Sequence, residues 1–315
     1  YTVKKILKIL IIKHGSLGDL IQANGAIEDI KLSNPKSHVV LLTSPHYFQL
    51  MNMCPYIDEV LVDKRLPRWN LFYLFSLKKK LSFYNFTHVF DLQNSSRTIF
   101  YKKYILNLSK WSSTETTLEK GQLKSDFDKE PVLERMKIQL KKSGVTTKHV
   151  EKSNLNWAIT NIRHITKKYF TKKYILIFPF CSPKLDKKKW PHFSILISQL
   201  KTRYYNKYDI VLAPGPNEIE EAKTFNAHIV LDAGKSLKLN QLISLVKDSS
   251  FVISNDTGPA HICSHMNKSG LVLFGSHTSA RKVSIETEKF KPISVKDLSL
   301  LKTETVMLEV KKILN

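Results

Sequence analysis

The chain has 315 residues, of which 42% are hydrophobic, and carries a formal net charge of +23 at pH 7. This length suits two domains of ordinary size, and no apolar run approaches the roughly 20 residues that a membrane-spanning helix needs. The cysteines Cys54, Cys181 and Cys263 are scattered and lack metal-ligand spacing. We therefore expect free thiols in a reducing cytoplasm and no metal centre.

The positive charge has three interpretations. Lysines supply most of it and are spread along the chain in pairs and triplets, which favours a solvated basic surface that reflects genome composition. The functional alternative is attraction to anionic lipid head groups or to a phosphorylated acceptor. Nucleic acid is the third interpretation, and no helix-turn-helix, zinc-finger or RNP signature supports it.

A glycine-rich turn follows the first predicted strand. Residues 6–12 form an apolar run broken only by Lys8, the pattern of a strand buried on both faces. His14-Gly15-Ser16-Leu17-Gly18-Asp19 follows, and a helical pattern then runs to Asn34-Pro35. The glycine spacing is not that of the dinucleotide fingerprint. Asp19 falls in the first helical turn, where it either caps the helix or serves as a general base.

Strands and helices alternate through both halves of the chain. The polar stretch from Ser112 to Glu130 is expected to be a long loop, because its opening residues offer no apolar face to bury, and a helix follows from Pro131 to about Lys142. The predicted strands are residues 6–12, 39–42, 60–62, 88–92, 174–178, 210–213, 229–231, 251–253 and 271–274.

Two successive β-α-β-α runs predict an α/β protein with two parallel-sheet domains. We place the domains at residues 1–165 and 166–315, with the join between Trp157 and Lys173. Ligands of such sheets bind at the carboxyl ends of the strands. The Asp19 turn and the Asp256 turn are therefore expected on either side of one cleft.

The most informative stretch runs from Phe251 to His261. A short buried strand stops at a run of small and polar residues, and Pro259 then opens a helical segment. Such a turn presents backbone N–H groups to an anion, and Gly258 lets a ligand approach the main chain. Asp256 and Thr257 add an acceptor and a hydroxyl, which suits the phosphate and sugar of a nucleotide-sugar. The alternative is an ordinary Asp/Thr helix cap.

Two further loops follow predicted strands of the second half. The loop after residues 174–178 contains Ser182 and a lysine run that includes Lys188, and it suits either a diphosphate or solvent. Glu218 follows residues 210–213 and is our candidate for a ribose contact, with Glu220 a competitor. A helix-start glutamate is the plainer interpretation of Glu218. His261 and His265 are four residues apart, but no other ligands near them support a metal site.

Three motifs occur in a defined order along the chain. They are Lys13-His14-Gly15-Ser16-Leu17-Gly18-Asp19, Lys188-Lys189-Trp190-Pro191 and Asn255-Asp256-Thr257-Gly258-Pro259-Ala260-His261. In these motifs the chain resembles glycosyltransferase family 9, which includes the ADP-heptose:lipopolysaccharide heptosyltransferases. The resemblance spans roughly residues 6–285, with weaker matches at Asp91-Leu92-Gln93 and Leu273-Phe274-Gly275.

The resemblance implies the type B glycosyltransferase fold, in which two Rossmann-like domains face a cleft. The acceptor would bind the first domain and the nucleotide-sugar the second, and we expect the last helix to pack back on the first domain. It also implies an inverting, metal-independent transfer that needs no cofactor. Asp19 matches the family's base, and Ser16 and Gly18 lie beside it on the acceptor side.

The donor side follows from the other two motifs. Lys188 matches the family's lysine and would meet the charge of the leaving diphosphate, together with Ser182 and the backbone at Thr257 and Gly258. By the same resemblance, Asp256 would hold a hydroxyl of the donor sugar. His261 closes this motif on the donor side.

The function implied is transfer of a sugar, heptose from ADP-heptose in the first instance, to a lipid A–Kdo-like glycolipid of lipopolysaccharide or a related surface glycan. The family's heptosyltransferases carry proline six residues after the aspartate, whereas Gly25 stands here, so the acceptor-side geometry is expected to differ. Two alternatives remain. One is a nucleotide-sugar-binding protein without catalysis, against which Asp19 and Lys188 argue, and the other is a basic nucleic-acid-binding protein.

The segment from Leu66 to Tyr84 suggests a partner. Aromatic residues alternate there with Arg68 and with Lys78-Lys79-Lys80, a mixture that suits an anionic membrane surface. The alternative is an amphipathic helix packed on the first sheet. Because the family's enzymes act on lipid-linked acceptors at the cytoplasmic face, we expect a cytoplasmic protein, peripheral at the inner membrane.

Overall fold

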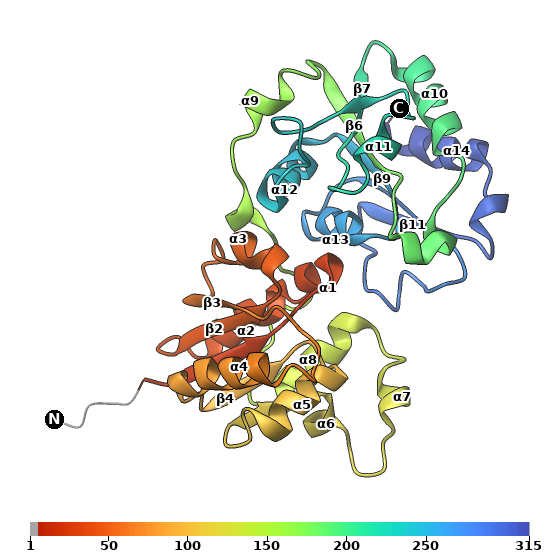
Figure 1. Ribbon diagram of the computed structural model, residues 1–315. Helices are drawn as coiled ribbons and strands as arrows, with labels where there is room; N and C mark the ends of the chain where they lie inside the picture. The colour runs from red at the N-terminus through yellow and green to blue at the C-terminus, as the bar shows by residue number, and fades with distance from the viewer. Residues whose placement is uncertain (1–5, 315) are drawn as a thin grey trace. The chain divides into compact units, whose positions relative to one another are not determined.

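A computed structural model describes residues 6–314, apart from the side chains of residues 183, 184 and 186. The chain divides into two compact units, Tyr1–Trp157 and Ala158–Asn315 (Figure 1). This division lies at the start of the predicted join and before the expected boundary at residues 165 and 166. None of the described helices is both long and apolar enough to cross a membrane.

The described residues of the first unit form a parallel sheet in the order β3-β2-β1-β4-β5. β1 (Lys8–Ile12) lies at its centre, between β2 (His38–Thr43) and β4 (His88–Asp91). β3 (Glu59–Val62) and β5 (Lys110–Ser112) form its edges. In the register of these strands, Leu10 lies opposite both Val40 and Val89. The strand order changes direction between β1 and β4, so the loops after these two strands emerge side by side at the carboxyl edge.

The described residues of the second unit form another parallel sheet, in the order β11-β10-β9-β6-β7-β8. Its central strands are β6 (Lys173–Phe178) and β9 (Phe251–Asn255), between which the strand order again changes direction. The remaining strands are β7 (Tyr208–Leu212), β8 (His228–Ile229), β10 (Gly270–Phe274) and β11 (Phe290–Ser294). The predicted strands are thus confirmed to within two residues at each end.

Helices connect the strands of both sheets. Those described in the first unit are α1 (Leu17–Gln22), α2 (Asn24–Ser33), α3 (Phe48–Met51), α4 (Leu71–Tyr84), α5 (Ser96–Tyr104), α6 (Thr114–Thr117), α7 (Lys124–Phe127) and α8 (Val132–Lys142). Those described in the second unit are α9 (Arg163–Thr166), α10 (Phe193–Tyr204), α11 (Ile219–Ala222), α12 (Leu239–Asp248), α13 (Gly258–His265) and α14 (Thr303–Leu314).

The last helix packs into the core of the second unit. α14 lies against α10 within the second unit, as Figure 1 shows. That this helix also packs back on the first unit stays a prediction. Its buried residues Val306, Met307 and Val310 belong to the core that also holds Leu196 and Trp190. Its apolar stripe thus completes the core of the second unit.

The stretch from Ser112 to Glu130 is not the loop that we predicted. It contains α6 and α7, and its opening residues Ser112, Ser113, Thr114 and Thr117 are buried. Hydrogen bonds replace apolar contacts there: Gln139 Nε2 donates to the Ser112 carbonyl at 3.1 Å, and Thr117 Oγ1 donates to the Ser113 carbonyl at 2.7 Å. These hydrogen bonds compensate part of the cost of burying a polar segment.

Candidate functional site

The second unit gathers charged side chains where its strand order changes direction. The loop after β6 carries Lys188, and Asp256 follows the neighbouring strand β9 directly. Lys188 Nζ lies 2.8 Å from Asp256 Oδ2. His277 follows β10, on the other side of β9, and its Nε2 lies 3.1 Å from the same oxygen. We call Lys188, Asp256 and His277 the donor-side cluster.

The donor-side cluster is held by a buried amide. Asn255 Nδ2 donates to the carbonyl of Pro179 at 2.9 Å, and Asn255 Oδ1 accepts from the backbone N–H of Trp190 at 3.1 Å. The Trp190 indole, itself 1% exposed, donates to the carbonyl of Leu301 at 2.9 Å. Both ends of the loop that carries Lys188 are therefore fixed to the residue before Asp256. Within Lys188-Lys189-Trp190-Pro191, Lys188 thus lies at the surface and Trp190 in the core.

The N-terminus of α13 lies next to Asp256. Thr257 stands at the N-cap position with extended backbone, and its side chain makes no capping hydrogen bond. The positive end of the helix dipole thus lies beside the Lys188 ammonium group. Together they form a site with the chemistry that an anionic diphosphate needs.

The histidines of α13 are internal to that helix. His261 is buried, and its carbonyl lies 3.0 Å from Nδ1 of His265. Burial and the neighbouring His261 lower the pKa of His265 to about 4, so its ring is neutral at pH 7. No group of three His, Cys, Asp or Glu side chains among the described residues is arranged to hold a metal ion.

Two predicted donor residues, Ser182 and Glu218, make other contacts. Ser182 is exposed, and Glu218 turns back to accept the backbone N–H of Gly215 at 2.7 Å. Burial raises the pKa of Glu218, and this hydrogen bond opposes the shift. Over the described residues, no hydrogen bond joins either side chain to Asp256, and their donor contacts stay predictions.

The first unit places a second set of polar groups at its own change of strand direction. Lys13 Nζ donates to the carbonyl of Leu92 at 2.8 Å, and the His14 backbone N–H donates to Gln93 Oε1 at 2.9 Å. Burial lowers the pKa of Lys13, whereas the charges of Asp19 and Asp91 act in the opposite direction. The loops after β1 and β4 are thus joined directly.

Asp19 lies in the first turn of α1, and one of its oxygens caps the helix. Its Oδ2 accepts from the backbone N–H of Ser16 at 2.9 Å and from Ser16 Oγ at 3.0 Å. Among the hydrogen bonds of the described residues, none reaches Oδ1. Ser16 is exposed, Asp19 half-buried and Gly18 buried. The capping interpretation is therefore correct for one oxygen, while the second oxygen has no such role.

A buried carboxylate that was not predicted from the sequence follows β3. Asp63 is completely buried, and its Oδ2 lies 2.8 Å from His14 Nε2 and accepts from Tyr101 Oη at 2.6 Å. Tyr73 donates to Oδ1 of the same carboxylate. Burial favours a higher pKa for Asp63, but the hydrogen bonds from His14, Tyr101 and Tyr73 hold it well below its usual value. Asp63 directly follows the predicted strand at residues 60–62, and the carboxyl ends of parallel strands lie at one edge of a sheet. This placement could have marked Asp63 as a candidate.

His277 was also missed. It lies three residues beyond β10, where the sequence analysis noted only Leu273-Phe274-Gly275. Its ring stacks on Phe274, with the centroids 6.0 Å apart. The placement of β10 beside β9, which brings His277 to Asp256, cannot be derived from this stretch alone.

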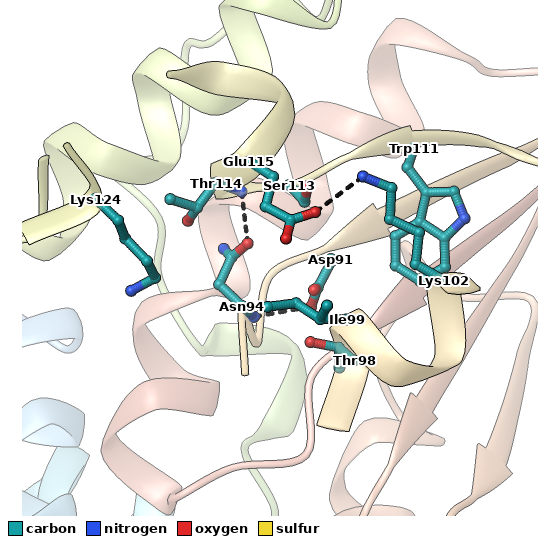
Figure 2. Close-up of a pocket in the computed structure, with 10 residues that line it drawn as sticks. All are labelled: Asp91, Asn94, Thr98, Ile99, Lys102, Trp111, Ser113, Thr114, Glu115 and Lys124. Carbon is teal, nitrogen blue, oxygen red and sulfur yellow. Dashed lines mark hydrogen bonds and ion pairs between the residues drawn. The ribbon is translucent and has the colours of Figure 1, made fainter. Parts of the chain in front are cut away.

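A small pocket opens at the carboxyl ends of β4 and β5. Figure 2 shows Asn94 at its centre, accepting from the backbone N–H of Thr114 at 2.6 Å and donating its own N–H to Asp91 Oδ1 at 2.8 Å. Lys102 pairs with Glu115 at 3.0 Å on its rim. The cavity volume of about 10 Å³ suits one water-sized group and not a sugar.

A model of glycosyltransferase family 9 (heptosyltransferase) matches residues 74–311. The chain belongs to this family. The match contains the Lys188 and Asp256 motifs, whereas the Asp19 motif lies before its first residue. The family predicted from the three motifs is thus confirmed, and with it the enzyme class, glycosyltransferase.

Solved structures of similar fold extend over nearly the whole chain. The Escherichia coli heptosyltransferase WaaC with ADP is 17% identical, with a TM-score of 0.72 over 97% of this chain and 99% of that chain. The Escherichia coli ADP-heptose lps heptosyltransferase II is 16% identical, with a TM-score of 0.73 over 98% of each chain. These similarities confirm the predicted type B fold with two Rossmann-like units.

A curated relative is similar over a shorter stretch. A Haemophilus influenzae protein described as "Putative glycosyltransferase" is 40% identical over 58 residues, which are 18% of this chain. The chain spans 17% of that relative's length.

Proposed function

We propose that this family-9 member is an inverting glycosyltransferase that moves a sugar, heptose from ADP-heptose in the first instance, to a glycolipid acceptor of lipopolysaccharide or a related surface glycan. The observation that carries the proposal is the pairing of Lys188 with Asp256 beside the N-terminus of α13. The similar WaaC structure was solved with ADP, which has the diphosphate chemistry that this site suits.

The donor side performs two tasks in this proposal. Negative charge grows on the diphosphate as its bond to the anomeric carbon breaks, and the Lys188 ammonium group and the N–H groups that open α13 stabilise it. Asp256 is 4% exposed, and its Oδ2 contacts both Lys188 and His277. In this proposal its carboxylate accepts a hydrogen bond from a hydroxyl of the donor sugar. Ser182 and Thr257 add hydroxyl donors to the diphosphate, and Glu218 accepts from the ribose. His261 supports the first turns of α13 from within the helix.

The acceptor side supplies the base. The acceptor oxygen forms a bond to the anomeric carbon, the carbon–diphosphate bond breaks on the opposite face, and the hydroxyl proton passes to Asp19. Ser16 donates two hydrogen bonds to Asp19 Oδ2, which orients the carboxylate and leaves Oδ1 to take the proton. Gly18 places the helix backbone close to this carboxylate. No metal ion or cofactor enters the scheme, because the lysine and the helix dipole supply the positive charge.

The test is a binding panel measured by calorimetry with ADP-heptose, other ADP- and GDP-sugars, and UDP-sugars. We expect ADP-heptose to bind most tightly and Lys188→Ala to weaken that binding. Preference for another sugar nucleotide would change the donor and keep the site. If no nucleotide-sugar binds, the proposal is wrong and a basic surface for nucleic acid becomes the leading alternative. Binding without transfer to any glycolipid acceptor would favour the alternative without catalysis.

A further inference from the structure

Helix α4 of the first unit is apolar on two opposite faces. Its inner face places Leu74, Leu77 and Leu81 in the core against the sheet. Its outer face exposes Phe72 (93%), Phe75 (73%) and Phe83 (80%). The inner face confirms the packing alternative of the sequence analysis, but packing on the sheet does not explain the outer face.

The exposed aromatic residues form one stripe. At 3.6 residues per turn, Phe72, Phe75, Lys79 and Phe83 fall within an arc of about 80° on the side away from the buried leucines. We call these four residues the α4 outer face. Trp69, which is 80% exposed, precedes the helix directly before its N-cap residue Asn70. Exposed phenylalanines are normal singly, but three in one stripe on a 14-residue helix indicate an interaction surface.

The charge around this stripe has one sign. Residues 64–90 contain six basic side chains and no Asp or Glu. The basic residues are Lys64, Arg65, Arg68, Lys78, Lys79 and Lys80, and all six are exposed. The partner of this surface is therefore anionic. A second copy of the same face would bring like charges together, which disfavours self-association.

We propose that the α4 outer face docks the protein on an anionic lipid bilayer. Phenylalanine rings enter the boundary between head groups and acyl chains, while the lysine ammonium groups stay at the level of the lipid phosphates. Because Leu74, Leu77 and Leu81 anchor α4 in the core, only side chains insert, and the fold does not open. This inference rests on the exposed face alone and does not depend on the proposed sugar transfer.

The test is co-sedimentation of the full chain with vesicles of phosphatidylcholine, with and without phosphatidylglycerol. We expect binding that requires phosphatidylglycerol. Replacing all three lysines (Lys78→Gln, Lys79→Gln, Lys80→Gln) should weaken it on the order of 100-fold, at roughly fivefold per lysine. Replacing the aromatic stripe (Phe72→Ser, Phe75→Ser, Phe83→Ser) should weaken it roughly tenfold or more and remove the part that resists salt.

Matched controls come from the second unit. A triple variant of exposed apolar residues (Ile195→Ser, Leu300→Ser, Leu308→Ser) and one of exposed basic residues (Lys167→Gln, Lys168→Gln, Lys235→Gln) should bind vesicles like the wild type. The second variant changes the net charge as much as the α4 lysine variant does. It therefore separates a local docking surface from general attraction by a basic protein.

The fluorescence of Trp69 reports membrane docking in the wild type, without a destabilising substitution. Its fluorescence should shift to shorter wavelength when phosphatidylglycerol vesicles are added to the wild type, and Trp69→Phe should lose this shift while still sedimenting.

Absence of vesicle binding by the wild type at low salt would overturn the proposal. So would equal loss in the control variants, a wild-type dimer that the Phe→Ser variant makes monomeric, or tighter binding to single-stranded nucleic acid that the α4 variants abolish. Donor binding by calorimetry is independent of every one of these outcomes.

Discussion

Lys188 Nζ and Asp256 Oδ2 lie 2.8 Å apart, although 68 residues of sequence separate them. Asp256 is buried, whereas Lys188 is partly exposed, so the ammonium group reaches from the surface to a fixed carboxylate. The pair stands where the strand order of the second sheet changes direction, between the loops after β6 and β9. Ligands of open α/β sheets bind at such points.

Loss of the Lys188 ammonium group should weaken donor binding. We expect Lys188→Ala to raise the Kd for ADP-heptose roughly 10- to 100-fold, because a charge-assisted hydrogen bond contributes about 1.5–3 kcal/mol. The matched control is Lys187→Ala, which removes the same charge from an exposed neighbour. Calorimetry measures the Kd for ADP-heptose of both variants, and only Lys188→Ala should raise it. Equal effects of the two would mean that only the general charge of the loop attracts the donor.

Glu218 offers a test of the ribose contact. Glu218→Gln keeps an oxygen for the Gly215 N–H, so the turn should survive, but a neutral amide accepts more weakly from a ribose. We expect donor affinity to fall about three- to tenfold in Glu218→Gln and further in Glu218→Ala. Glu220→Gln, at a site whose side chain is 84% exposed, serves as the control. If Glu218→Gln binds the donor like the wild type and only Glu218→Ala loses stability, Glu218 merely shapes the turn.

The Asp63 carboxylate predicts how stability depends on pH. Its pKa is lower in the folded than in the unfolded protein, so its contribution is complete above the unfolded value of about 3.9 and is lost as the pH falls below it. We expect Asp63→Asn to lower the free energy of unfolding on the order of 2 kcal/mol at pH 7, and the difference from wild type to shrink towards pH 3. Urea unfolding at both pH values measures this, with Glu220→Gln as a control. A difference that is constant with pH would show that packing, not charge, is lost.

Close packing explains why Gly25 stands where the family's heptosyltransferases carry proline. A Cβ atom there would lie 2.1 Å from the carbonyl oxygen of His149. The segment around His149 cannot retreat easily, because Asp29 Oδ2 accepts from the backbone N–H groups of Lys148, His149 and Val150. Gly25→Ala should therefore destabilise the protein by about 3 kcal/mol or more.

Gly144→Ala is the control for this effect. No atom lies within 4 Å of its added Cβ, although its φ of +80° is unfavourable for alanine. We expect a cost of about 1 kcal/mol for Gly144→Ala. Thermal or urea unfolding compares the two variants, and similar losses in both would show that α2 and the 148–150 segment separate readily.

The alternation of apolar runs and turns was enough to predict both sheets, because buried parallel strands are nearly continuous in Ile, Leu and Val. The two edge strands β5 and β11 were missed, since Lys110-Trp111-Ser112 and Phe290–Ser294 lack such runs. Pro292 is tolerated in β11 because an edge strand leaves one side without ladder hydrogen bonds.

Some residues of the candidate site could likewise be predicted from the sequence, and others could not. Asp19, Lys188 and Asp256 stand in motifs that are local in sequence, so their types and spacing identified them. His277 and Asp63 meet their partners only through the order of the strands in each sheet, and that order is a property of the whole fold. The residues next to them in the sequence form no recognisable motif.

Asp19 as the general base is tested most directly by transfer of heptose from ADP-heptose to a lipid A–Kdo acceptor by the wild type, Asp19→Asn and Ser16→Ala. Loss of a general base should lower turnover 10²- to 10⁴-fold in Asp19→Asn with ADP-heptose affinity unchanged. Ser16→Ala loses the hydrogen bond from Ser16 Oγ to Asp19 Oδ2 and keeps the one from the backbone N–H, so it should cost at most about 1 kcal/mol of stability and keep turnover within about tenfold. Turnover in Asp19→Asn equal to that of Ser16→Ala would contradict a catalytic role for Asp19 and leave it as a helix cap.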